Sequence, residues 1–205
     1  MSTAWRIISY GSSEPALYSE AARRLRGQCE SLGIDCHIPV IDFEIVDRKH
    51  ICLYKPTFIL EQLNRFPIPT LWLDCDAALV GAPDLPWEDP WDLGFVPNTR
   101  RRKTRDFLVK TGFRARSTRW VNTVSGFAVA FRPTEATFHF LAIWNYLCKW
   151  PDLAPGGDHK RMCWARKMMK LREVNIAQYL QKCVVRDVGK DKEHDLRGMH
   201  RHKLD

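Results

Sequence analysis

The stretch LYKPTFILEQLNRFPIPTLWLDCDAALVGAPDL, residues 53–85, places a helix, a strand and an acidic turn in direct succession. Pro56 suits the first turn of a helix, and apolar residues recur after it at helical spacing, at Ile59, Leu63 and Phe66. Two prolines, at positions 67 and 69, end that helix. Thr70–Leu73 then predicts an apolar strand, which runs directly into Asp74-Cys75-Asp76. The stretch therefore predicts a helix followed by a strand whose carboxyl end is acidic.

The flanking sequence alternates between strands and helices in the same way. Trp5–Tyr10 predicts a strand, residues 12–33 a helix that Gly33 ends, and residues 34–41 a second strand. Residues 51–54 predict a short strand or a turn. Further strands are expected at 93–96, 122–131 and 183–188, and helices from Thr134 to about Trp150 and from Asp158 onwards. This alternation predicts a single α/β domain over residues 1–205, with a mostly parallel central sheet flanked by helices.

The composition is that of an ordinary globular protein. The chain has 205 residues, 45% hydrophobic and 27% charged, enough to bury one full core without disulfides. Its longest apolar runs have five residues, so we expect no membrane-crossing segment and no signal peptide. The seven cysteines are an odd number without a CxxC pair. They argue against a zinc site or a disulfide framework and favour a cytoplasmic protein with reduced thiols.

The net positive charge is concentrated in one segment. Residues 98–119 hold nine basic residues and one acid, a net charge that equals the +8 of the whole chain. Such a segment attracts anions, such as nucleotides, phosphorylated lipids, acidic glycans or nucleic acids. It predicts either a solvated, mobile surface loop or a lid over a phosphate-rich substrate. Residues 189–205 form a polar tail.

Asp74 and Asp76 are the residues with the clearest chemical use. They follow an apolar strand, and ligands of parallel sheets bind at the carboxyl ends of the strands. The strand period of two would place both carboxylates on one side, where hard oxygen donors suit Mg²⁺ or Mn²⁺. Such an ion holds a pyrophosphate and stabilises the charge that develops when it leaves. The alternative is that one aspartate caps a loop and the other is solvated.

Three motifs, taken in order, resemble the glycosyltransferases of the GT-A fold, which use nucleotide-diphosphate sugars. In the first, Lys55-Pro56 leads a helix and the strand ends on Leu73 followed by Asp-x-Asp-Ala. The second is VNTVSGFAVAFRPTEATFHFLAIW, residues 121–144, which matches the family at Asn122, Thr123, Gly126 and Trp144. The third is PGGDHKRMCWA, residues 155–165, where Asp158 matches an Asp-Gln helix start but His159 replaces the usual glutamine.

The resemblance implies a GT-A-like fold and a metal-dependent glycosyltransferase. Its cofactor would be Mn²⁺ or Mg²⁺, and its donor would be a UDP- or GDP-linked sugar. The acceptor is not identified, and the basic segment favours an anionic one. Asp74 and Asp76 would hold the metal ion. His200 or His202 would complete the metal shell, since a neutral imidazole suits Mn²⁺, although histidines in a polar tail are usually solvated.

The remaining implied residues concern the substrates. Tyr10 would stack on the base, unless it is an ordinary buried tyrosine, and Lys55 would reach a phosphate, unless it is a surface lysine. Asn122 and Gly126 belong to the matched substrate-binding strand. Asp158 would orient or deprotonate the acceptor hydroxyl, or cap its helix. Trp72, Trp144 and Cys75 are expected in the core and receive no chemical role.

Two other functions fit parts of the sequence. A HAD-like phosphatase also begins its site with an apolar run and Asp-x-Asp, with the first acid as nucleophile and the second as acid or base. A nucleic-acid-binding protein would use the basic segment 98–119 for phosphate contacts, although no helix-turn-helix, zinc-finger or RNP motif accompanies it. A nucleic-acid partner is therefore not expected.

Overall fold

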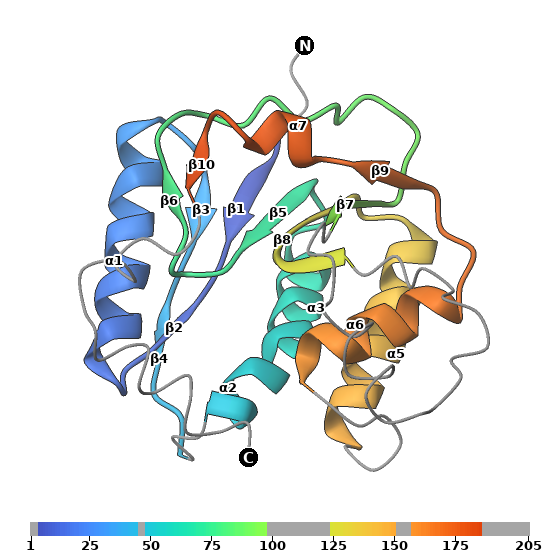
Figure 1. The fold of residues 1–205 in the computed structure, drawn as a ribbon, viewed down its shortest axis with the longest axis horizontal. Helices are drawn as coiled ribbons and strands as arrows, with labels where there is room; N and C mark the ends of the chain where they lie inside the picture. The colour runs from blue at the N-terminus through green and yellow to red at the C-terminus, as the bar shows by residue number, and fades with distance from the viewer. Residues whose placement is uncertain (1–3, 45–47, 98–123, 151–156, 186–205) are drawn as a thin grey trace, which may run out of the picture.

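The computed structural model describes residues 4–44, 48–97, 124–150 and 157–185, which build a layered α/β fold (Figure 1). A six-stranded sheet lies at its centre, in the order β3-β1-β5-β8-β7-β9. Its strands are β1 (Arg6–Ile8), β3 (Cys36–His37), β5 (Thr70–Leu73), β7 (Leu93–Pro97), β8 (Val124–Phe131) and β9 (Glu173–Asn175). β1 is parallel to β3 and β5, and β7 to β9, whereas β8 is antiparallel to its neighbours β5 and β7. The predicted α/β fold with a mostly parallel sheet is confirmed.

Helices and two small sheets surround this central sheet. The helices are α1 (Ala16–Ser31), α2 (Arg48–Leu53), α3 (Lys55–Arg65), α5 (Glu135–Lys149), α6 (Asp158–Lys167) and α7 (Ala177–Leu180). β2 (Gly11–Ser12) pairs in parallel with β4 (Val40–Ile41), and β6 (Ala78–Leu79) pairs antiparallel with β10 (Val184–Val185). Among the described helices, none is long and apolar enough to cross a membrane.

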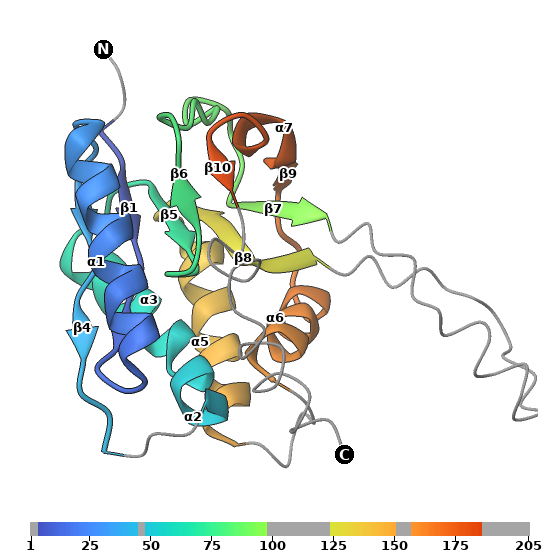
Figure 2. The same cartoon turned by 60° about the vertical axis from the view of Figure 1, so that its left-hand side comes forward.

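The sheet separates two hydrophobic cores, as its strand alternation requires. Along β5, Trp72 packs into one core, whereas Leu71 and Leu73 pack into the other. The first core takes apolar residues from α3, α5 and α6, and the second takes them from α1 and α7. Figures 1 and 2 show α1 on one side of the sheet and α3, α5 and α6 on the other. Both faces of the sheet are therefore covered, so we expect a functional site at the ends of its strands.

Two glycines allow α1 to pack closely and to end. A Cβ on Gly11 would lie 2.3 Å from the carbonyl oxygen of Tyr18, so only glycine permits this approach of β2 to the helix. Gly33 follows the helix with a φ of 66°, the left-handed conformation that glycine adopts at low cost. The prediction that Gly33 ends this helix is confirmed.

Some predicted elements differ from those in the structure. Residues 51–54 were expected to be a strand or a turn, but Arg48–Leu53 form helix α2. Short apolar runs do not distinguish a strand from a helix. In the structure, Ile51 is buried in the first core. The strand expected over Trp5–Tyr10 is shorter in the structure, where β1 spans Arg6–Ile8, and β2 follows it at Gly11–Ser12. Asp158 is the first residue of α6 rather than its N-cap, which is Gly157.

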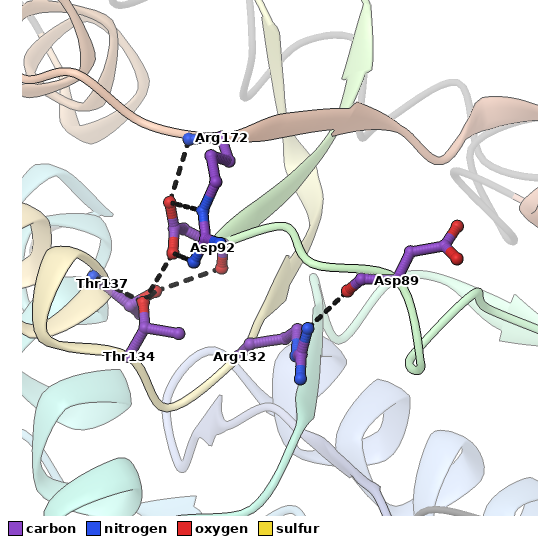
Figure 3. Close-up of polar contacts among 6 residues, drawn as sticks. All are labelled: Asp89, Asp92, Arg132, Thr134, Thr137 and Arg172. Atoms are coloured by element: carbon purple, nitrogen blue, oxygen red, sulfur yellow. Dashed lines mark hydrogen bonds and ion pairs between the residues drawn. The ribbon is translucent and has the colours of Figure 1, made fainter.

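Asp92, the residue before β7, is held in place by hydrogen bonds to both of its carboxylate oxygens (Figure 3). Asp92 is 3% exposed, and its Oδ1 accepts hydrogen bonds from Thr134 and from the Arg172 guanidinium, at 2.9 and 2.8 Å. Its Oδ2 accepts from the Arg172 backbone N–H and Nε, at 2.9 and 3.2 Å. Thr134 also caps α5, as predicted, by accepting from the Thr137 N–H at 3.3 Å. Asp92 thus joins β7, α5 and the segment that leads to β9.

Candidate functional site

The acidic turn follows β5 at the carboxyl edge of the sheet. The Asp74 N–H donates to the Phe127 carbonyl at 2.7 Å, which continues the pairing with β8 by one residue. The Ala77 N–H then donates to the Asp74 carbonyl at 2.9 Å and closes a turn through Cys75 and Asp76. The expected strand alternation between the two aspartates is therefore wrong, because the chain turns at Cys75. Both aspartates are half-buried at this edge.

Lys55 joins two of the predicted acids into one cluster. It is the first residue of α3 and only 6% exposed. Its Nζ lies 2.7 Å from Asp74 Oδ1 and 3.1 Å from Asp158 Oδ2. Burial lowers the pKa of Lys55, but Asp158 and Asp74 raise it by more, so that its pKa is held well above the ordinary value. A buried, protonated lysine thus holds together two carboxylates from different parts of the chain.

Two further groups complete the surroundings of Lys55. The Gly126 carbonyl accepts a hydrogen bond from Nζ at 3.3 Å, so the ammonium has two hydrogen-bond acceptors, Asp74 and Gly126, and an ion pair with Asp158. The Trp72 indole N–H donates to Asp74 Oδ1 at 3.0 Å, and Nζ lies 5.1 Å from the Trp72 ring centroid. Trp72 is a core residue, as predicted, but it also orients Asp74, which sequence analysis missed.

His159 is the second residue that sequence analysis left without a role. Its Nδ1 accepts a hydrogen bond from the Gly126 N–H at 3.1 Å. An accepting ring nitrogen carries no proton, so this contact requires Nδ1 to be unprotonated. The only sequence signal for His159 was that it replaces the usual glutamine in the third motif.

Asp74 and Asp76 have the chemistry that a hard divalent cation requires. Among the described residues, Lys55 and Trp72 donate to the Asp74 carboxylate, and both donate to Oδ1 rather than to Oδ2. Burial, followed by Asp76 and Asp74, raises the pKa of Cys75 to about 12, so its thiol is protonated at neutral pH in the metal-free protein. Its sulfur is also a softer donor than Mn²⁺ or Mg²⁺ prefers. In the part of the chain that the structure describes, no three His, Cys, Asp or Glu residues form a metal-binding group. Carboxylate oxygens, such as those of Asp74 and Asp76, are the ligand type that Mn²⁺ and Mg²⁺ prefer.

The other predicted site residues have different placements. Asp158, whose side chain is 15% exposed, is brought to the acidic turn through Lys55. Tyr10 is 6% exposed, and its hydroxyl donates to the Ile51 carbonyl at 2.5 Å within a cluster of aromatic rings. Little of its ring is left for a base to stack on. Three predicted ligands, Asn122, His200 and His202, lie outside the described residues, as do the basic segment 98–119 and the tail 189–205.

No protein family model matches the sequence, and no curated protein sequence matches it. Solved structures do match. A glycosyltransferase involved in the glycosylation of the major capsid of PBCV-1 is 11% identical, with a TM-score of 0.65 over 96% of this chain and 98% of that one. The bifunctional glycosyltransferase WbbM is 8% identical, with a TM-score of 0.51 over 85% of this chain and 39% of that one.

A third match is weaker. The galactosyltransferase LgtC is 10% identical, with a TM-score of 0.46 over 77% of this chain and 69% of that one. The PBCV-1 and WbbM structures show that the chain has a fold found in glycosyltransferases. The GT-A-like fold that the three motifs predicted is thus confirmed.

Proposed function

We propose that this protein is a metal-dependent glycosyltransferase that moves a sugar from a nucleotide-diphosphate sugar to an acceptor. The observation that carries the proposal is the Lys55 cluster, defined by Lys55, Asp74 and Asp158. It lies beside the acidic turn, at the carboxyl edge of a sheet whose fold is found in glycosyltransferases. Acids at this edge are well placed to act on a bound ligand, whereas fold alone does not assign a function.

Asp74 and Asp76 would hold Mn²⁺ or Mg²⁺ on the diphosphate of the donor. The bound ion would neutralise the charge that develops as the nucleoside diphosphate leaves. His200 or His202 as a further ligand remains a prediction. What the chain itself contributes is a fixed Asp74, because Lys55 and Trp72 both bind Oδ1 and set the direction of the carboxylate.

Lys55 and Asp158 would have different roles, Lys55 in orienting the acids and Asp158 in acting on the acceptor. The Lys55 ammonium already donates to Asp74 and Gly126 and pairs with Asp158, which favours a role in orienting the two acids over direct capture of a phosphate. Asp158 would orient or deprotonate the acceptor hydroxyl, and the Lys55 cation fixes its Oδ2 for this purpose. The net positive charge of the segment 98–119 favours an anionic acceptor.

A thermal-shift panel of UDP, GDP and CDP, each with and without Mn²⁺, tests the proposal. A ligand at about 100 times its dissociation constant stabilises the native state by about 2.7 kcal/mol. For a domain of this size that corresponds to a rise in Tm of roughly 5–10 °C. We expect one nucleotide to give such a rise only with Mn²⁺, and Asp74→Asn and Asp76→Asn to abolish the metal-dependent part.

The matched control is Asp84→Asn, an exposed aspartate outside the cluster, which should respond like the wild type. Wild-type responses in both Asp74→Asn and Asp76→Asn would remove the site assignment. Release of inorganic phosphate from a phosphomonoester, without any response to nucleotides, would favour the phosphatase hypothesis instead.

A further inference from the structure

Gly126 lies in a stretch of β8 that is out of register with both neighbouring strands. Between Phe95 and Val96 of β7, the paired residue on β8 changes from Val129 to Ser125, so three residues of β8 have no partner on β7. On the other side, the register with β5 runs to the pair Leu73–Ala128, and one further hydrogen bond, from the Asp74 N–H to the Phe127 carbonyl, extends it. Gly126 is therefore outside the pairing register on both sides. A glycine inside a strand often marks such an irregularity.

Two side chains, rather than neighbouring strands, form hydrogen bonds with the backbone N–H and carbonyl of Gly126. Its N–H donates to His159 Nδ1 at 3.1 Å, and its carbonyl accepts from Lys55 Nζ at 3.3 Å. One residue of β8 thus links a histidine of α6 to the lysine at the start of α3. Backbone groups buried without a partner cost free energy, so both contacts also stabilise the irregular conformation of β8.

We propose that His159 is a positioning residue for the Lys55 cluster. By accepting the Gly126 N–H, it holds the Gly126 carbonyl against Lys55 Nζ and so keeps the ammonium between Asp74 and Asp158. Its importance for catalysis rests on the proposed function, but the positioning itself does not.

The first turn of α6 reaches Lys55 by two routes, which makes the arrangement specific. Asp158 binds Nζ directly, and the next residue, His159, acts through Gly126. The fit between β8 and α6 is close, since a Cβ on Gly126 would lie 3.3 Å from His159 Nδ1. The Trp144 indole N–H donates to the Asp158 carbonyl at 3.0 Å and fixes the same turn to α5. A small displacement of α6 would therefore change the contacts of Lys55 with Asp158 and with the Gly126 carbonyl.

Two NMR signals test the positioning without any substrate. The first is the hydrogen exchange of the Gly126 amide, and the second is the Lys55 ammonium signal, assigned with Lys55→Arg. His159→Leu and His159→Ala remove the acceptor, whereas His159→Asn offers an oxygen at a place similar to that of Nδ1. The matched control is His139→Leu, because His139 is an exposed histidine on α5.

In the variants without an acceptor, we expect the Gly126 amide to exchange roughly tenfold faster and the Lys55 signal to shift or broaden. His159→Asn and His139→Leu should keep both signals near those of the wild type. If His159→Leu does not fold, His159→Ala gives the same test. Unchanged signals in the variants without an acceptor would overturn the proposal, as would equal losses in His159→Asn.

The test separates this inference from the proposed function. Both NMR signals are read in the free protein, so they are informative even if no sugar nucleotide is a donor. Wild-type protein that turns over no donor would remove the proposed function and leave the positioning of Lys55 intact. If the protein is a transferase, His159→Asn should also restore the activity that His159→Leu loses.

Discussion

Asp92 and Asp74 lie at opposite ends of the strands of the same sheet and differ in how their carboxylates are bound. Asp92 precedes β7 and is 3% exposed, with both carboxylate oxygens bound by Arg172 or Thr134 (Figure 3). Asp74 follows β5, its side chain is 33% exposed, and its bonds to Lys55 and Trp72 both use Oδ1. A carboxylate with both oxygens bound stabilises the fold, whereas Asp74, whose Oδ2 accepts no hydrogen bond from the described residues, is better suited to bind a ligand.

The sharpest way to break this comparison is to remove one charge from the Lys55 cluster. Asp74→Asn keeps an oxygen that can accept from Lys55 and Trp72, so we expect a loss of stability below about 1 kcal/mol. Transfer should fall by on the order of 10³-fold, about 4 kcal/mol, because the donor loses its charged ligand group. Urea unfolding and release of nucleoside diphosphate measure the two effects. A large loss of stability with unchanged transfer would make Asp74 a structural residue like Asp92.

The reverse pattern is expected on the other edge. Asp92→Ala removes the acceptor of Thr134 and of the Arg172 backbone N–H, and should destabilise the fold by about 3 kcal/mol. Transfer per folded molecule should not change. Asp89→Ala is the control, because the Asp89 side chain is exposed and its backbone carbonyl, which binds Arg132, is retained. Equal stability of the two variants would contradict the role given to Asp92.

Acid should reveal the same difference. Hydrogen bonds from Arg172 lower the pKa of Asp92 from 3.8 to about 2. A carboxylate with a lowered pKa stabilises the native state above its unfolded pKa and loses this contribution as the pH falls through the folded value. Wild-type stability should therefore fall between about pH 4 and pH 2. Asp92→Ala should have a flatter pH profile over this range in urea unfolding, and parallel profiles would count against the assignment.

The smallest effect is expected at Cys75, between the two aspartates of the turn. Its pKa of about 12 leaves the thiol protonated and unreactive at neutral pH. Cys75→Ala should change stability by less than about 1 kcal/mol and leave transfer unaltered. Slow alkylation of Cys75 by iodoacetamide, followed by mass spectrometry, checks the first part of this reasoning. Loss of metal-dependent nucleotide binding in Cys75→Ala would show that the thiol takes part.

The strongly patterned elements of the fold could be predicted, and the irregular ones could not. Thr70–Leu73 is apolar and follows two prolines, and it forms β5 with the predicted bounds. Helix α2 was missed because four apolar residues fit either kind of element. The turn at Cys75 was missed because it depends on one backbone hydrogen bond, from Ala77 to Asp74.

The site was predicted as a set of residues but not as an arrangement. The motifs named Lys55, Asp74 and Asp158 separately, and the fold places a carboxylate oxygen of each aspartate within 3.1 Å of Lys55 Nζ. Trp72 and His159 were missed because an aromatic residue in an apolar strand already has a packing role, and because the His159 contact depends on a register shift in β8. Gly126 inside the strand was the one visible sign of that shift.

Release of nucleoside diphosphate from a panel of UDP- and GDP-linked sugars, in the presence of Mn²⁺, tests the central claim most directly. The account predicts release from at least one donor by the wild type and by Asp84→Asn. It predicts none above background from Asp74→Asn or after removal of the metal by a chelator. Equal release by the wild type and Asp74→Asn would contradict the claim that this half-exposed carboxylate serves the departure of a diphosphate.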